Sequence, residues 1–478
     1  MVFSSLYFIY LFLAVVFLAY YLCKKIQHKN AVLIVASLVF YAWGEPVWVV
    51  MLVFSALLNW FCALMIEKNR GKGTDKIFTA AAIVIDLLLL IIFKYSGFIV
   101  ENINGVIGIV SPALKLPVPQ ITMPIGISFF TFQAISYIMD CYWETVPAQK
   151  SFWKFLLYLS LFPQLVAGPI VRYSVIEKEI SDRKATPVDI SEGAMRAIIG
   201  VSKKVIVANN LYAIVDQFFG SNISGLSVMG TWYTVILYSL YVYFDFSGYS
   251  DIAIGLGRMF GFHFNENFNY PFICKTISEF WQRWHISLSS FFRDYLFYAP
   301  IFGRPRKYLN LFLVWFCTGM WHGASWNFII WGLYFGTFIF IETLIGKKRM
   351  KKWNIVLTHI YSKIIIVIGF GIFYFTDFSQ LGQFFLNITG ISMLTNGAPF
   401  VDILTWNSLL NNIWLIIFAI AVSMPIVPKI KHFFFEWGNN KVYAVGKIGA
   451  TVVCCALLVI SSILLVDNTN NPFLYFRF

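Results

Sequence analysis

Residues 443–466 read YAVGKIGATVVCCALLVISSILLV, a run in which Lys447 is the only charged side chain. A helix needs about 20 mostly apolar residues to cross the hydrocarbon core of a bilayer. Because the backbone of such a segment must satisfy its own hydrogen bonds in lipid, this run predicts a transmembrane helix. Similar runs predict further spans near residues 6–22, 31–43, 47–66, 77–94, 121–139, 203–219, 231–255, 309–323, 327–345, 355–375 and 409–427.

The composition of the whole chain agrees with this interpretation. Hydrophobic residues make up 59% of the 478 residues, charged residues make up 12%, and Phe alone occurs 50 times. A soluble domain has about 45–50% apolar and about 25% charged residues. The composition therefore excludes a soluble enzyme, a disordered chain and a disulfide-stapled secreted domain, and it predicts an all-α polytopic membrane protein. No hydrophilic stretch is long enough for a separate soluble domain, so residues 1–478 are expected to form one integral-membrane domain.

Charge and cysteine content indicate no further partner class. The formal net charge of +13 comes from basic residues between apolar runs, as expected for cytoplasmic loops, and nucleic-acid binding is not expected. The cysteines form no CxxC pair and have no metal-ligand spacing, so neither a metal site nor a redox site is predicted. The seven cysteines are Cys23, Cys62, Cys141, Cys274, Cys317, Cys454 and Cys455.

The distribution of basic residues predicts the orientation of the chain. All the basic loops can be cytoplasmic if the N-terminus lies outside, and the stretch 376–408, without Lys or Arg, then forms an outer loop. The C-terminal residues 467–478 would also emerge outside. The apolar run 152–171 is interrupted by Pro163 and Gly168-Pro169, which predicts a broken or re-entrant helix covered by protein.

One histidine lies between two apolar runs, in the sequence FCTGMWHGASW at 316–326. Ionisable groups inside a bilayer are costly and mark candidate functional sites. Gly319 and Gly323 remove side chains around His322 and permit close approach of a substrate or of another backbone. Desolvation keeps such an imidazole neutral, the form that can remove a proton from a hydroxyl. The alternative is a packing histidine bonded to a neighbouring carbonyl.

A second histidine, His285, lies in ISEFWQRWHISLSSFFRDY at 277–295. Helical spacing places Trp281, His285 and Ser289 on one face, while Glu279 and Arg283 form an i,i+4 pair on another. The mixture of aromatic, basic and short polar residues predicts a helix at the membrane interface. The alternative is a surface helix with no catalytic role. His263 remains unassigned.

Two acidic residues interrupt the apolar sequence YVYFDFSGYSD at 241–251. A membrane-embedded Asp245 or Asp251 needs a cationic partner, which Arg258 or Arg283 could provide. A structural ion pair is the favoured role. The glycines that follow do not have GxGxxG spacing or a βαβ context, so a dinucleotide site is rejected.

Together, these motifs resemble the membrane-bound O-acyltransferase (MBOAT) superfamily, in the branch of the alginate and peptidoglycan O-acetyltransferase membrane subunits. The matching stretches lie between about residues 120 and 335. They are MPIGISFFTFQ at 123–133, FPQLVAGPI at 162–170, DFSGYSD at 245–251, NFNYPF at 267–272, EFWQRWHISLS at 279–289 and MWHG at 320–323.

The resemblance implies a fold and a set of roles. The fold would be a ring of about 11–12 transmembrane helices around a central tunnel, with re-entrant and interfacial helices. His322 matches the principal catalytic histidine, and His285 matches the second. Acetyl-CoA would be the cytoplasmic donor substrate, with no bound cofactor. Further candidates for the tunnel or donor site are Trp281, Arg283, Trp321, Asp245 and Asp251.

The resemblance also implies partners and a location. The acceptor would be an envelope or exported polysaccharide, and an extracytoplasmic SGNH/esterase-like acetyltransferase subunit would complete the transfer. The chain would lie in the bacterial cytoplasmic (inner) membrane. Its terminal sequence NPFLYFRF, at 471–478, is similar to a terminal Phe-x-Tyr-Phe motif in this branch, which makes Tyr475 a candidate acyl carrier. An aromatic interfacial anchor is the alternative for this tail.

Three other functions remain open at this stage. The first is D-alanyl transfer to teichoic acid from a carrier protein. The second is a transporter or flippase that moves an intact substrate, although the inverted repeats often seen in such folds are not visible. The third is a scaffold for a polysaccharide export complex, in which histidine substitutions would act only through stability.

Overall fold

The computed structural model describes residues 2–166, 168–300, 306–436 and 440–467. All regular elements in these ranges are helical, and none of the described residues forms a β-strand. Six helices are long and apolar enough to cross a membrane, and a bent pair adds a seventh candidate. The all-α polytopic membrane fold is thus confirmed, whereas the ring of helices around a tunnel stays a prediction. The six are Val49–Lys68, Thr74–Ile109, Pro187–Phe219, Trp326–Ile345, Ile355–Tyr374 and Val442–Val466.

The described chain divides into two compact units. Unit 1 contains Met1–Ala194 and Ala253–Asn265, and unit 2 contains Met195–Ile252 and Glu266–Phe478. The elements of unit 1 are η1 (Tyr7–Phe12), α1 (Leu13–Leu22), α2 (Ile26–Gly44), α3 (Val49–Lys68), α4 (Thr74–Leu90), η2 (Ile91–Tyr95), α5 (Ser96–Val110), η3 (Pro112–Leu114), α6 (Ile127–Tyr142), α7 (Phe152–Ser160), α8 (Phe162–Leu165) and α9 (Tyr173–Ser181), with the start of α10 (Pro187–Ser202).

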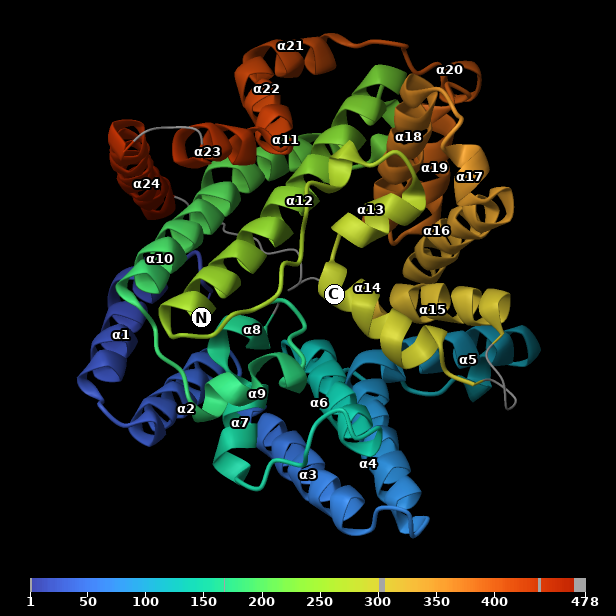
Figure 1. Cartoon of the computed structure of the whole chain (residues 1–478). Coiled ribbons are helices and arrows are strands. Elements are labelled where there is room, and N and C mark those ends of the chain that lie inside the picture. Colours follow the sequence, from blue (N-terminus) through green and yellow to red (C-terminus); the bar gives the residue numbers. More distant parts are fainter. Residues whose placement is uncertain (1, 167, 301–305, 437–439, 468–478) are drawn as a thin grey trace. The chain divides into compact units, whose positions relative to one another are not determined.

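Within unit 1, α3, α4 and α6 pack against one another (Figure 1). The interrupted run at 152–171 forms two short helices, α7 and α8, separated at Leu161, and the helix residues from Phe155 to Leu165 are buried. The predicted helix break is therefore confirmed. Burial in protein makes it tolerable, because a broken helix exposes backbone polar groups that lipid could not satisfy.

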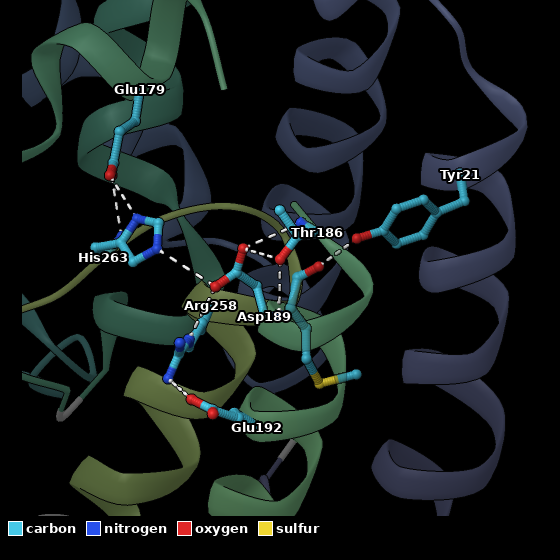
Figure 2. A network of polar contacts seen from close by, with 8 residues as sticks. Tyr21, Glu179, Thr186, Asp189, Glu192, Arg258 and His263 are labelled. Carbon is cyan, nitrogen blue, oxygen red and sulfur yellow. Dashed lines mark hydrogen bonds and ion pairs between the residues drawn. The ribbon is translucent and has the colours of Figure 1, made fainter. Parts of the chain in front are cut away.

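His263 belongs to a polar network in unit 1 that joins α9, α10 and the end of α12 (Val228–Met259) (Figure 2). Its Nδ1 lies 2.7 Å from Glu179 Oε1, and its backbone N–H donates to Glu179 Oε2. Arg258 pairs with Asp189 at 3.2 Å and also reaches Glu192. These contacts give His263 a structural position among carboxylates, where the sequence had left it unassigned.

Unit 2 holds the remaining elements. They are the end of α10, η4 (Lys203–Ala208), α11 (Asn209–Phe219), η5 (Ile223–Gly225), most of α12, η6 (Pro271–Ile273), α13 (Ile277–Arg283), α14 (Ile286–Phe292), η7 (Arg293–Phe297), α15 (Lys307–His322), α16 (Trp326–Ile345), α17 (Lys347–Met350), α18 (Ile355–Tyr374), α19 (Phe378–Ile388), α20 (Ser392–Thr395), α21 (Ile403–Asn411), α22 (Ile413–Val422), α23 (Ile426–Glu436) and α24 (Asn440–Asp467).

The predicted span 203–219 is too short. Helical structure runs from Pro187 through η4 to Phe219, so Lys203 and Lys204 lie in the middle of a long helical segment instead of at its start. The lysines are tolerated there because both form ion pairs with aspartates of α12. In unit 2, Gly200 lies so close to the Gly248 carbonyl that a Cβ atom at Gly200 would be only 2.5 Å from its oxygen.

Helices α15 and α16 form an antiparallel helical hairpin, which is stabilised by a close contact between their backbones. A Cβ atom at Gly332 would collide with the carbonyl oxygen of Trp315, and one at Gly319 would collide with the carbonyl oxygen of Phe328. Small residues allow helix backbones to approach in this way inside a membrane. This contact fixes the end of α15, where His322 lies.

We expect Gly332→Ala to destabilise the protein, because the atom that its methyl group meets is rigid helix backbone. Overpacking of this kind costs about 1–3 kcal/mol, so the thermal unfolding temperature of the detergent-solubilised protein should fall. Gly382→Ala is the matched control, since Gly382 in α19 has open space around its Cβ position. Equal unfolding temperatures for the two variants would show that a methyl group at position 332 fits between the helices, against the close backbone contact.

Candidate active site

His322 is the last residue of α15, and 7% of its surface is exposed. The two neighbouring glycines serve the packing of α16. Gly319 faces the backbone of Phe328, and the Phe328 ring fills the space beside Gly323. Of the two uses that the sequence left open for these glycines, close approach of another backbone is the one observed at Gly319.

A small cavity in unit 2 is lined by His322. Its volume is about 20 Å³, enough for about one water molecule. The imidazole is edge-on to Trp331 and Phe373, with ring centroids 4.8 and 5.2 Å away. Apart from His322, the lining residues are apolar or aromatic: Val242, Phe246, Trp284, Trp331, Phe370 and Phe373. His322 thus faces a small space whose walls offer few polar groups.

The second histidine does not lie on the continuous helix that its spacing predicted. α13 ends at Arg283 and α14 begins at Ile286, with His285 between them in a left-handed backbone conformation (φ 45°, ψ 53°). The shared face of Trp281, His285 and Ser289 was therefore wrong. The break is stabilised by segment 267–269, because Ile286 N–H donates to the Asn267 carbonyl and Asn269 N–H donates to the Arg283 carbonyl.

His285 is fully buried. Burial lowers its pKa to about 3, so its ring is neutral at physiological pH. Its Nδ1 lies 3.3 Å from Asn267 Oδ1, and its Nε2 has no hydrogen-bond partner among the described residues. A non-glycine residue in the left-handed region costs free energy, and such strain is concentrated at functional sites.

Two aromatic residues connect the surroundings of the histidines. The Trp321 ring centroid lies 5.6 Å from His285 and 5.0 Å from His322. The Phe246 ring lies 4.6 Å from His285, and Phe246 also lines the cavity at His322. The structure therefore brings both predicted histidines into one aromatic site within unit 2, with Trp321 at its centre.

The partners expected for the two aspartates were wrong. Lys204 pairs with Asp245 at 2.6 Å, and both side chains are buried. Lys203 and Arg196 pair with Asp251 at 2.7 and 2.9 Å. Arg258 and Arg283 instead pair with carboxylates near them in the structure, the latter with Glu279 as predicted for an i,i+4 pair. The long helical segment through α10 and η4 supplies the cations, because it packs along α12.

The other predicted site residues do not line the described cavity. Trp281 packs in an aromatic cluster with Trp315, Trp331 and Phe335, next to the cavity wall. Arg283 is partly exposed, and neither it nor Asp251 is among the residues that line the described cavity. Tyr475 lies outside the described residues, as does the rest of the C-terminal motif 471–478.

Sequence reasoning missed several residues that surround the histidines or pair with the predicted aspartates. Lys204 carried a usable signal, because a lysine inside an apolar run requires a partner. Asn267 lies in a quoted motif, but its position beside His285 depends on a contact between segments 18 residues apart. Val242, Trp331, Phe370 and Phe373 had no separate signal, since apolar residues are abundant throughout the chain.

Comparison with known proteins identifies the class. A model of the membrane-bound O-acyltransferase family matches residues 147–379. A probable alginate O-acetylase of Azotobacter vinelandii is 38% identical over 380 residues, covering 78% of this chain and 75% of the relative. The peptidoglycan O-acetyltransferase of Helicobacter pylori is 36% identical over 372 residues, covering 70% and 69%. The teichoic acid D-alanyltransferase of Bacillus subtilis is 28% identical over 329 residues, covering 64% and 79%.

The chain belongs to the membrane-bound O-acyltransferase family. It is a multi-pass membrane protein and an O-acyltransferase, which confirms the resemblance seen in its motifs.

The buried ion pair between Lys204 and Asp245 gives a stability prediction. Lys204→Met should destabilise the protein by about 3–5 kcal/mol, because it leaves a buried carboxylate without this ammonium group. Lys204→Met combined with Asp245→Leu should recover most of that loss, and Lys184→Met, at an exposed lysine, is the control. Unfolding of the solubilised protein measures all three. If the double variant were as unstable as Lys204→Met alone, the loss of stability would not come from the unpaired Asp245 carboxylate.

Proposed function

We propose that this protein transfers an acetyl group from a cytoplasmic thioester donor, acetyl-CoA, for O-acetylation of an envelope or exported polysaccharide. The observation that carries the proposal is the position of His322, a mostly buried imidazole that lines a cavity with apolar and aromatic walls. A neutral imidazole at this position can accept a proton from a hydroxyl group.

The chemistry assigned to His322 is general-base catalysis. The imidazole takes the proton of an acceptor hydroxyl as the hydroxyl oxygen attacks the thioester carbonyl carbon. The new C–O bond forms, the C–S bond breaks, and the leaving thiolate takes up a proton, so that a free thiol and an O-acyl ester result. His285 is assigned to the donor side, either positioning the donor or assisting protonation of the thiolate.

The comparison with relatives favours acetyl over a D-alanyl group. Relatives named as O-acetylases or O-acetyltransferases are 36–38% identical to this chain, whereas a relative named as a D-alanyltransferase is 28% identical. D-alanyl transfer from a carrier protein is the alternative that a comparison of donors would reveal.

The same relatives support the acceptor class and the location. Their names refer to alginate and peptidoglycan, which are polysaccharides or contain them, and we assign a polysaccharide acceptor to this chain. We place the protein in the bacterial cytoplasmic membrane, with an extracytoplasmic SGNH/esterase-like subunit that completes the transfer. This division of labour requires a route for the acyl group across the bilayer, and we assign that route to the helices of this chain.

Tyr475 is the proposed carrier between donor and partner. A thiol has a pKa near 8.5 and a phenol near 10, while a sugar hydroxyl is a far weaker acid. Each transfer moves the acyl group onto an oxygen that is a poorer leaving group than the atom it leaves. Transfer from thioester to phenol ester to sugar ester is therefore favourable at each step. The phenol ester retains enough reactivity for the second transfer.

We expect His322→Ala to lower the rate of acetyl transfer in membrane vesicles by about 10²–10⁴-fold, the usual contribution of a general base. The assay follows radiolabelled acetyl from acetyl-CoA to protein or polymer. His28→Ala, which removes an exposed imidazole, should retain the wild-type rate. An unchanged rate in the His322 variant would reject the mechanism.

For the carrier, Tyr475→Phe removes only the phenolic oxygen. We expect this variant to bind donor normally but to lose both the acetylated-protein intermediate, detected by mass spectrometry, and delivery to polysaccharide. Tyr443→Phe, at an exposed tyrosine, is the control and should retain both. Full polysaccharide acetylation by Tyr475→Phe would assign the tail to membrane anchoring instead.

A further inference from the structure

The side chain of Asn267 holds His285 through a set of short polar contacts in unit 2. Asn267 is fully buried, and its Oδ1 lies 2.9 Å from Ser287 Oγ, 3.2 Å from Ser287 N and 3.3 Å from His285 Nδ1. Its Nδ2 has no hydrogen-bond partner among the described residues. All the polar contacts of this amide group therefore converge on one oxygen atom.

The backbone of Ser287 determines which way the amide points. A backbone N–H can only donate a hydrogen bond, so the atom of Asn267 that faces it must be the acceptor oxygen. The same oxygen faces His285 Nδ1. A hydrogen bond between them requires a proton on Nδ1, because an unprotonated Nδ1 would place two lone pairs against each other.

The other neighbour of Nδ1 does not reverse this assignment. Ser287 Oγ lies 3.5 Å from His285 Nδ1 but only 2.9 Å from Asn267 Oδ1, so the hydroxyl group donates its hydrogen bond to the amide oxygen of Asn267. With Nδ1 protonated, a neutral His285 carries its lone pair on Nε2. That nitrogen is buried and has no partner in the described part of the chain.

We propose that Asn267 is a positioning residue that fixes His285 in the Nδ1-protonated tautomer, so that Nε2 presents an acceptor lone pair for the acyl donor. The role in catalysis rests on the proposed function, whereas the tautomer does not. Which ring nitrogen of a histidine is protonated follows from the hydrogen bond made by the other one.

This assignment decides between the two roles left for His285. A neutral ring whose proton is bonded to Asn267 has no proton to give from Nε2. His285 therefore accepts a hydrogen bond from an N–H or O–H group of the donor and orients it, while the thiolate takes up the proton that His322 removed from the acceptor hydroxyl. The left-handed backbone at His285 supports a fixed ring orientation, because the flanking main-chain bonds to segment 267–269 hold it in place.

The test is ¹⁵N NMR of the full-length protein labelled at its six histidines. Protonated and unprotonated ring nitrogens resonate in separate regions, and the spectrum of His285→Gln identifies the signals of His285. We expect a protonated Nδ1 and an unprotonated Nε2 in the wild type. A wild-type His285 protonated on Nε2 would overturn the proposal.

Three variants separate the tautomer from folding. Asn267→Ala should release His285 to the Nε2-protonated form, while the main-chain bonds at 267–269 remain available to retain the fold. Asn267→Asp keeps an acceptor oxygen and should retain the wild-type tautomer, and its negative charge should raise the pH at which the His285 signals titrate. Ser287→Ala should leave the tautomer unchanged. If Asn267→Ala kept Nδ1 protonated, Asn267 would not be the determinant.

Kinetics add a readout of function. At metal sites, loss of a group that orients a histidine typically lowers activity about 10–100-fold, and we expect a loss of the same order here. We expect Asn267→Ala to lose kcat/KM for acetyl-CoA within that range and Asn267→Asp to restore part of it. If the wild type itself transferred no acetyl group, the proposed function would fail, but the NMR result would still decide the tautomer.

Discussion

The backbone contact between α15 and α16 determines where the principal histidine can lie. Gly332 and Gly319 let the two helices approach until backbone faces backbone, and His322 ends α15 within about two turns of that contact. The cavity beside it is then completed by aromatic residues of α16, α18 and α12. A larger residue at either glycine would separate the helices and move the imidazole away from those walls.

Low polarity around the site has two consequences for its ionisable groups. The charges that remain are paired, as Lys204 with Asp245 and Lys203 with Asp251 show, because an isolated charge in such surroundings is costly. The buried histidine at 285 stays neutral instead. A neutral imidazole keeps one ring nitrogen with a lone pair, which is the form that the acceptor role proposed for His285 requires.

The sequence predicted the helical membrane fold and the break at 152–171 correctly, because hydropathy and the positions of Pro and Gly are local properties, while the catalytic roles of His322 and His285 stay predictions. The sequence-based prediction was wrong where the helical spacing of the sequence was continuous but the helix in the structure was broken. Residues 277–295 have helical spacing throughout, yet the chain breaks at His285, since main-chain bonds to segment 267–269 replace helical ones. It also failed for the partners of Asp245 and Asp251, because the neighbouring cations lie about 40 or more residues away in sequence.

The amino-acid sequence by itself determined that this protein lies in a membrane and which class of enzyme it belongs to. Its apolar runs are long enough for a bilayer, and its motifs are shared with a family of O-acyltransferases. Only the tertiary structure decided which side chains surround the histidines and which ring nitrogen of His285 is available. Those features depend on contacts between distant segments, and the same apolar and polar residues would satisfy the local patterns in many other arrangements.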